Sequence, residues 1–80
     1  MRVKIFVSLK GGVLDPQGKA IEGSLHTLGY AEVQDVRMGK YLELNVEASS
    51  REAAESRIRE MCEKLLANPV IEDYRFEIEG

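Results

Sequence analysis

The chain passes from a helix to a strand at Leu66-Ala67-Asn68-Pro69-Val70-Ile71-Glu72, and this stretch sets the fold of its second half. Asn68-Pro69 stops the helix, because a residue that precedes proline disfavours the helical region. The helix before it has an apolar stripe made of Ala54, Ile58, Met61, Cys62 and Leu65. After it, Tyr74, Phe76 and Ile78 alternate with charged residues, which is typical of a half-buried strand.

The start of the same helix is marked by Ser49-Ser50-Arg51-Glu52. Ser49 and Glu52 are three residues apart, as in a capping box, in which each side chain bonds to the other residue's backbone N–H. We therefore expect Ser49 to be the N-cap.

The first half of the chain has a similar plan. A strand is predicted from the alternation of Val3, Ile5, Val7 and Leu9, and Gly11-Gly12 allows the backbone to turn after it. Asp15 suits the N-cap of a helix and Pro16 its first position. The helix has an apolar stripe of Ile21, Leu25 and Leu28, and Gly29 is expected to end it.

Two further strands are expected between the helices, in a hairpin that bends near Gly39-Lys40. Their apolar faces are Val36 with Met38, then Leu42, Leu44 and Val46. The order β-α-β-β-α-β predicts an α+β, two-layer sandwich with a four-stranded antiparallel sheet and both helices on one face, ferredoxin-like or a variant of it. If the first and third strands are neighbours, Lys4 faces Glu43 across them.

Length and composition limit the possible functions. The 80 residues predict one domain, 1–80, whose thin core makes self-association reasonable. A net charge of −3 is the wrong sign for non-specific binding to nucleic acid. No apolar run approaches the ~20 residues of a membrane span, and a lone cysteine fits a reducing compartment, so we expect a cytoplasmic chain with no membrane partner.

No set of residues suited to catalysis or metal binding can be found in the sequence. Cys62 lies on an apolar stripe, where a thiol is usually a small hydrophobe, and one histidine, His26, is too few for a typical zinc site. Gly11-Gly12 lacks the pattern of a phosphate-binding loop. Phe6 and Tyr41, on the outer sheet face, lack the basic surroundings of an RNA-binding sheet. With these two aromatic residues among its charged ones, this face is too apolar to be plain solvent surface, and we interpret it as a subunit contact.

Five segments of the sequence carry a resemblance: Leu9-Lys10, Gly12–Gly18, Leu28-Gly29, Val36–Lys40 and Lys64–Tyr74. They resemble the PurS family, the small subunit of multi-subunit phosphoribosylformylglycinamidine (FGAM) synthase in de novo purine synthesis. The likeness runs through essentially the whole chain. The segment Ser24-Leu25-His26 departs mildly from the Ala-Leu that is more usual in that helix.

The resemblance implies a non-catalytic role inside an assembly. The small subunit, a homodimer or homotetramer, would bridge a glutaminase subunit, which releases ammonia, and a large synthetase subunit. ATP and magnesium would be used by the large subunit, and this chain would bind no cofactor. The chief alternative is an ACT-like regulatory module that binds a small molecule near Gly11-Gly12. A second alternative is an acylphosphatase-like hydrolase, which is less well supported because the chain lacks the required arginine-bearing phosphate loop.

Partner contacts are expected in the loops at the helix ends and around the predicted bend. Arg37 and Lys40 can supply charge-assisted contacts. The candidate partner-binding residues are Asp15, Pro16, Gln17, Gly18, Arg37, Gly39, Lys40, Asn68, Pro69 and Glu72. Asp15, Pro16, Asn68 and Pro69 are also explained as helix start and stop signals, so loop shaping and direct contact both stay open for them.

Overall fold

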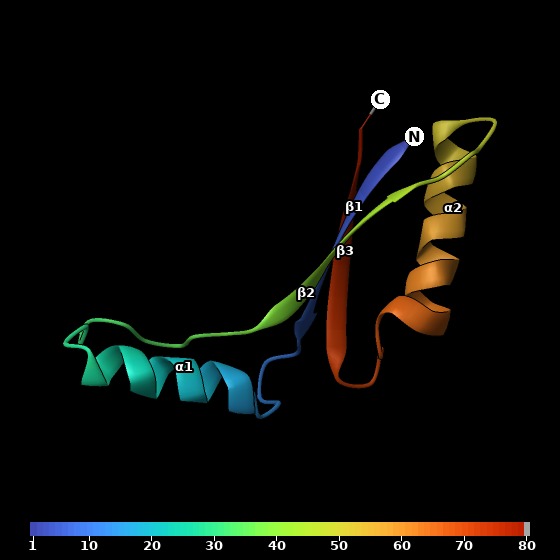
Figure 1. Ribbon diagram of the computed structural model, residues 1–80. Coiled ribbons are helices and arrows are strands. Elements are labelled where there is room, and N and C mark those ends of the chain that lie inside the picture. Colours follow the sequence, from blue (N-terminus) through green and yellow to red (C-terminus); the bar gives the residue numbers. More distant parts are fainter. Residues whose placement is uncertain (80) are drawn as a thin grey trace.

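The computed structural model describes residues 1–79, and Figure 1 shows their arrangement. In chain order the elements are β1 (Arg2–Leu9), α1 (Pro16–Thr27), β2 (Gly39–Asn45), α2 (Arg51–Met61), the π-helical turn η1 (Cys62–Leu66) and β3 (Glu72–Glu79). The α+β class expected from the sequence is confirmed.

The strands form a three-stranded antiparallel sheet in the order β2-β1-β3. β1 pairs with β2, and Lys4 lies opposite Glu43, as expected from the sequence for the case in which these two strands are neighbours. The ion pairs join other partners, however: Lys4 Nζ lies 2.7 Å from Glu79 Oε1, and Glu43 pairs with Arg2.

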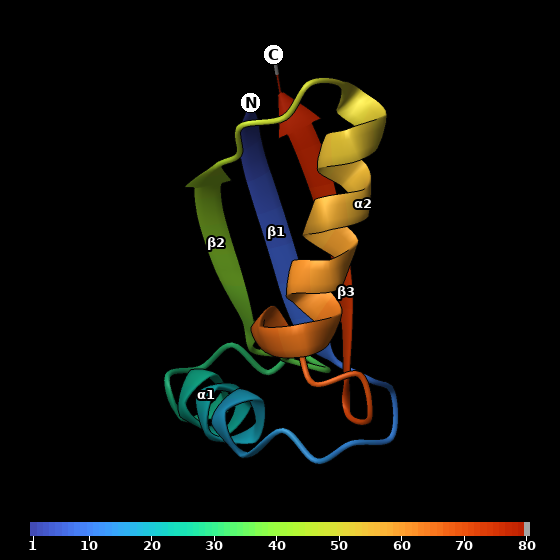
Figure 2. The same ribbon diagram turned by 90° about the vertical axis from the view of Figure 1, so that its right-hand side faces the viewer.

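The core lies between the sheet and α2, which covers one sheet face (Figure 2). Val3, Ile5 and Val7 of β1 are almost fully buried, because the central strand has neighbours on both sides and a helix above it. From α2 and η1 they meet Ala54, Ile58 and Cys62, each with no exposed surface.

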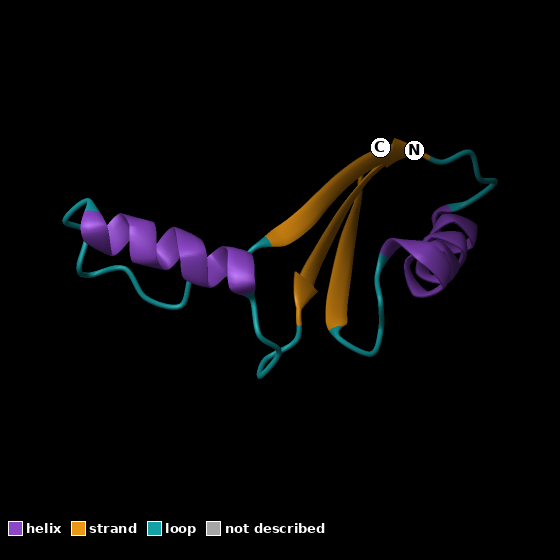
Figure 3. Cartoon of the chain, turned by 60° about the horizontal axis from the view of Figure 1, so that its bottom comes forward, coloured by secondary structure: helices purple, strands orange, loops and turns teal. Residues whose placement is uncertain are grey.

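The expectation of a four-stranded sheet with both helices on one face is wrong for the described chain. Residues 31–38, which we call the arm, form no strand and run beside α1, which projects from the sheet on the side away from α2 (Figure 1, Figure 3). Among residues 1–79, no side chain of α1 belongs to the core cluster. The predicted hairpin at Gly39-Lys40 is therefore absent, and β2 continues the line of the arm.

Hydrogen bonds to α1 explain why the arm does not fold back. Met38 N donates to Asp15 Oδ2 over 2.8 Å, and Val36 N donates to Glu22 Oε1 over 3.3 Å. His26 Nε2 lies 2.7 Å from the Val33 carbonyl oxygen. These bonds occupy backbone groups of the arm, so it follows α1 and not the sheet.

The ends of the second helix differ from the expectation in two ways. Ser50, and not Ser49, is the N-cap, and its Oγ accepts from Ala53 N over 3.1 Å. The π-helical turn adds a residue to the last turn, so Leu65 is 82% exposed while Leu66 and Ala67 pack against the core.

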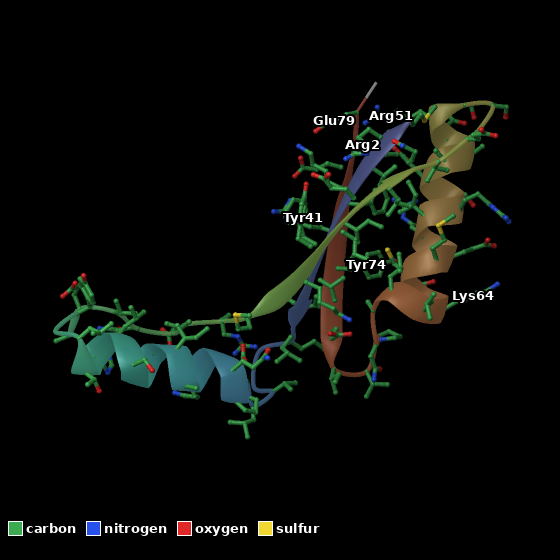
Figure 4. All side chains as sticks on the ribbon, in the orientation of Figure 1. Arg2, Tyr41, Arg51, Lys64, Tyr74 and Glu79 are labelled. Atoms are coloured by element: carbon green, nitrogen blue, oxygen red, sulfur yellow. The ribbon has the colours of Figure 1, made fainter. Side chains whose placement is uncertain are left out.

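The open face of the sheet carries Phe6 and Tyr41, with ring centroids 5.1 Å apart. The guanidinium of Arg75 lies 3.9 Å from the centre of the Phe6 ring. Figure 4 shows Tyr41 pointing away from α2, whereas Tyr74 lies on the side that faces it. Cation–π stacking partly covers this face, which remains a candidate for a subunit contact.

Candidate functional site

One end of the molecule brings the candidate residues together. Here β1 ends, β2 and β3 begin, and α1 starts; we call this the loop end. It holds a pocket of about 330 Å³. The pocket is lined by Val7, Ser8, Leu9, Asp15, Pro16, Gln17, Met38, Gly39, Lys40 and Glu72.

Asp15 organises one wall of the loop end. Its Oδ1 accepts from Gly18 N and its Oδ2 accepts from Met38 N, each over 2.8 Å, so it caps α1 and holds the arm. The side chain is 6% exposed. The bonds from the Gly18 and Met38 amides, with the charge of Arg37 nearby, hold the pKa of Asp15 below its ordinary value of 3.8. Asp15 is therefore an ionised structural group.

Arg37 fastens the arm to the end of β1. Its Nη2 donates to the carbonyl oxygens of Leu9 and Lys10, each over 3.1 Å. Its Nε lies 3.9 Å from Asp15 Oδ2. The guanidinium therefore makes hydrogen bonds within the chain, although the side chain is 41% exposed.

Gly18 and Gly39 are required by close backbone approaches. A Cβ at Gly18 would lie 2.2 Å from the Val36 carbonyl oxygen, and one at Gly39 would lie 2.5 Å from the Val7 carbonyl oxygen. Both distances are far below ordinary contact, so any side chain would push the arm from α1 or β2 from β1.

The turn before β3 is bonded to Glu72, which lines the pocket. Asn68 N donates to Glu72 Oε1 over 2.6 Å, and Glu72 N donates to the Asn68 carbonyl oxygen over 2.7 Å. Lys40 Nζ lies 3.7 Å from Glu72 Oε2 and donates to the Leu66 carbonyl oxygen over 3.4 Å. This network joins β2, η1 and β3 around the pocket, while Pro69 is exposed on the turn itself.

The structure therefore places all the candidate residues at the loop end. Asp15, Pro16, Gln17, Gly39, Lys40 and Glu72 line the pocket, and Gly18, Arg37, Asn68 and Pro69 belong to the segments around it. Sequence reasoning missed the ion pair of Lys10 Nζ with Asp73 Oδ1 at 2.7 Å. It also missed four lining residues: Val7, Ser8, Leu9 and Met38. For Ser8 the signal was the strand register, since Ser8 lies opposite both Gly39 and Asp73.

The loop end is suited to recognition by shape and charge. Its charges are paired, and among residues 1–79 no group of three or more histidine, cysteine or acidic residues is arranged to hold a metal ion. Cys62 is buried in the core, and burial raises the pKa of its thiol, which makes it a poor nucleophile. Over the same residues, no helix has the length and apolar character to cross a membrane.

Comparison with known proteins agrees with the resemblance found in the sequence. The family model described as PurS, phosphoribosylformylglycinamidine (FGAM) synthase, matches residues 2–80. The chain belongs to the PurS family. It is 60% identical to the PurS subunit of FGAM synthase from Bacillus subtilis over 78 residues, which cover 98% of this chain and 92% of that protein. By family, it is a subunit of a ligase complex of purine biosynthesis.

Solved structures of the family share the fold. A crystal structure of Bacillus subtilis PurS matches with a TM-score of 0.89 and 59% identity, covering 99% of this chain and 98% of that one. A chain of the structure named PurLQS from Thermotoga maritima matches with a TM-score of 0.87 and 37% identity, covering 95% of this chain and 93% of that one. The extended α1 and arm are thus part of an overall shape that the family shares.

Proposed function

We propose that this chain is a non-catalytic bridge between the glutaminase subunit and the ATP-dependent synthetase subunit of FGAM synthase. It acts as a homodimer or homotetramer in the cytoplasm and holds its two partners so that ammonia passes between them. The similar structure from Thermotoga maritima is named PurLQS, a name that refers to more than PurS alone. This supports a role for the present chain in an assembly.

The observation that carries this proposal is the loop end. Residues from four separate segments converge there in a network of hydrogen bonds and ion pairs, and the lone cysteine, Cys62, is buried in the core away from this pocket. Rigid, shape-specific surfaces suit protein recognition, because little conformational freedom is lost on binding.

An ACT-like regulatory module is less well supported. Its ligand would be expected at Gly11-Gly12, but those residues form an exposed turn and do not line the pocket at the loop end. Calorimetry of the isolated chain with amino acids and purine nucleotides tests this alternative. Saturable micromolar binding would favour it over the bridge.

Reconstitution of the synthase tests the bridge directly. FGAM formation is measured with glutamine and, separately, with ammonia as nitrogen donor, in the presence and absence of this chain. Omission should abolish glutamine-driven turnover and spare most ammonia-driven turnover, because only the former needs the glutaminase aligned with the synthetase. Equal glutamine-driven turnover without the chain would refute the proposal.

A further inference from the structure

β3 is an outer strand of the sheet and has a neighbour on one side only (Figure 2). It is eight residues long, from Glu72 to Glu79, and pairs with β1 alone among the described elements. The edge of a sheet presents a row of N–H and C=O groups that can pair with another chain, so proteins usually shorten, cover or charge such edges. The groups on the outer side of β3 therefore need to be accounted for.

The ladder between β1 and β3 determines which backbone groups point outward. Lys10 N donates to the Ile71 carbonyl oxygen over 2.8 Å, in the same register that sets Ser8 opposite Asp73. Because bonded and non-bonded pairs alternate in an antiparallel ladder, Asp73 and the odd-numbered residues after it bond to β1. The N–H and C=O groups on the outer side therefore belong to Tyr74, Phe76 and Ile78.

The chain itself occupies only the two ends of this outer side. At the start of β3, Glu72 N donates over 2.7 Å to a carbonyl oxygen of the turn before it. At the other end, Arg51 Nη2 donates to the Ile78 carbonyl oxygen over 3.3 Å. No hydrogen bond among residues 1–79 uses the outward backbone groups of Tyr74 or Phe76. The middle of the edge is therefore free to pair with another strand.

The side chains along this edge give it a pattern of charge. Arg75 and Glu77 lie on the open face of the sheet, are 66% and 52% exposed, and pair with each other over 2.9 Å. A strand beside β3 places its own side chains opposite these two. A matching segment has a negative side chain opposite Arg75 and a positive one opposite Glu77, two residues apart. Its other face is apolar, because Phe76 lies between them and packs against the core on the α2 side.

A second copy of β3 matches this edge less well. In the antiparallel register centred on Phe76, Arg75 would face Glu77 of the other copy. The same register sets Asp73 opposite Glu79 twice, and like charges that lie directly opposite each other destabilise a sheet. The edge is therefore better suited to a strand from a different chain.

We infer that an extended segment of a partner subunit pairs with the outer side of β3 and adds a fourth strand to the sheet. The segment is held by backbone bonds to Tyr74 and Phe76 and is selected by its opposite charges toward Arg75 and Glu77. This inference rests on the proposed function and deepens it, because it names a contact on the strand edge in addition to the loop end.

Amide hydrogen exchange tests the inference, because it measures the N–H groups one at a time. The isotope-labelled chain is exchanged in heavy water, alone and in the complex with both partner subunits, and is then quenched and measured by NMR. In the chain alone, the amides of Arg75 and Glu77 should exchange slowly and those of Tyr74 and Phe76 quickly, since only the former bond to β1. In the complex, the amides of Tyr74 and Phe76 should slow by at least about tenfold.

The possible outcomes separate this contact from the bridge. Unchanged exchange at Tyr74 and Phe76 in an intact complex would overturn the added strand and leave the bridging role standing. Slow exchange of both amides in the isolated chain would also overturn it, since a second copy would then occupy the edge. Failure of the three proteins to form a complex would remove the bridge and this contact together.

An exchange of charges tests how the segment is selected. Arg75→Glu combined with Glu77→Arg keeps the ion pair and the net charge of the chain, but reverses the pattern that the segment meets, so affinity measured by calorimetry should fall about tenfold. The matched control is Arg57→Glu combined with Glu60→Arg on α2, where the pair spans 3.4 Å and the side chains are 69% and 51% exposed. The control should bind as the unaltered chain does. No loss in the first variant, or an equal loss in both, would overturn selection by these charges.

Discussion

At the scale of single residues, Asp15 does the most to shape the loop end. One carboxylate caps α1, accepts from the arm at Met38, and faces Arg37. Its ordinary pKa is 3.8 and these bonds lower the value in the folded chain. Because the folded pKa is the lower one, the stabilisation is complete above the ordinary value and is lost as the pH falls through the folded value.

Asp15→Asn should therefore remove a pH-dependent part of the stability. The free energy of unfolding, measured by urea denaturation, should differ between the unaltered chain and the variant by a constant amount above about pH 5. The difference should shrink between pH 4 and pH 2 as Asp15 becomes protonated. A difference that stays constant down to pH 2 would show that the charge of Asp15 is not what matters.

Gly18 gives a second prediction at the residue scale, with Gly23 in the same helix as its control. Gly18→Ala should destabilise by about 1–3 kcal/mol, because the new methyl group meets the Val36 carbonyl oxygen at 2.2 Å. Gly23→Ala should stabilise by up to about 1 kcal/mol, because nothing lies within 4 Å of its Cβ and alanine is the better helix former. Thermal unfolding should show melting temperatures that move in opposite directions, and a shift of the same sign in both variants would contradict this account.

At the scale of elements, the sequence predicted what local chemistry determines. The cap at Asp15, the stop at Asn68-Pro69 and the alternation of β3 depend on neighbours along the chain, and the structure has them. Ser50 was not predicted as the cap, because serine suits the N-cap at either position and the three-residue spacing to Glu52 pointed to Ser49. The π-helical turn leaves Leu65 exposed, and the spacing of apolar residues, which placed Leu65 on the buried stripe, did not predict it.

The two serines give the prediction at this scale. Ser50→Ala should cost about 1 kcal/mol of stability, because the Ala53 amide loses its side-chain acceptor. Ser49→Ala should cost only a few tenths of that amount, because Ser49 is exposed and precedes the cap. Urea denaturation of both variants measures the difference, and equal costs would return Ser49 to the capping role that the sequence suggested.

At the scale of the whole molecule, the sequence pointed to one neighbour of β1, the strand that contains Glu43, but not to the position of α1. Lys4 facing Glu43 follows from alternation within two strands, whereas the place of α1 depends on bonds between Asp15, Glu22, His26 and the distant arm. The candidate residues were predicted in separate loops. In the structure they lie near each other on one surface, because the ends of four elements meet there. The family resemblance, and not periodicity, pointed to those loops.

That surface leads to the last prediction, which concerns assembly with the partner subunits. Lys40 is 58% exposed, and its contacts with Glu72 at 3.7 Å and with the Leu66 carbonyl oxygen at 3.4 Å are long, so they add little to stability although the Glu72 side chain is only 15% exposed. Lys40→Ala should therefore leave melting temperature and oligomer mass unchanged. It should weaken co-elution with the glutaminase and synthetase subunits in gel filtration, since Lys40 lines the pocket where contact is proposed.

Lys19→Ala is the matched control, because Lys19 is exposed on α1 outside that pocket and forms no ion pair among residues 1–79. If both variants co-elute as the unaltered chain does, Lys40 is not part of the contact; if both weaken it equally, the effect is one of net charge and not of the loop end.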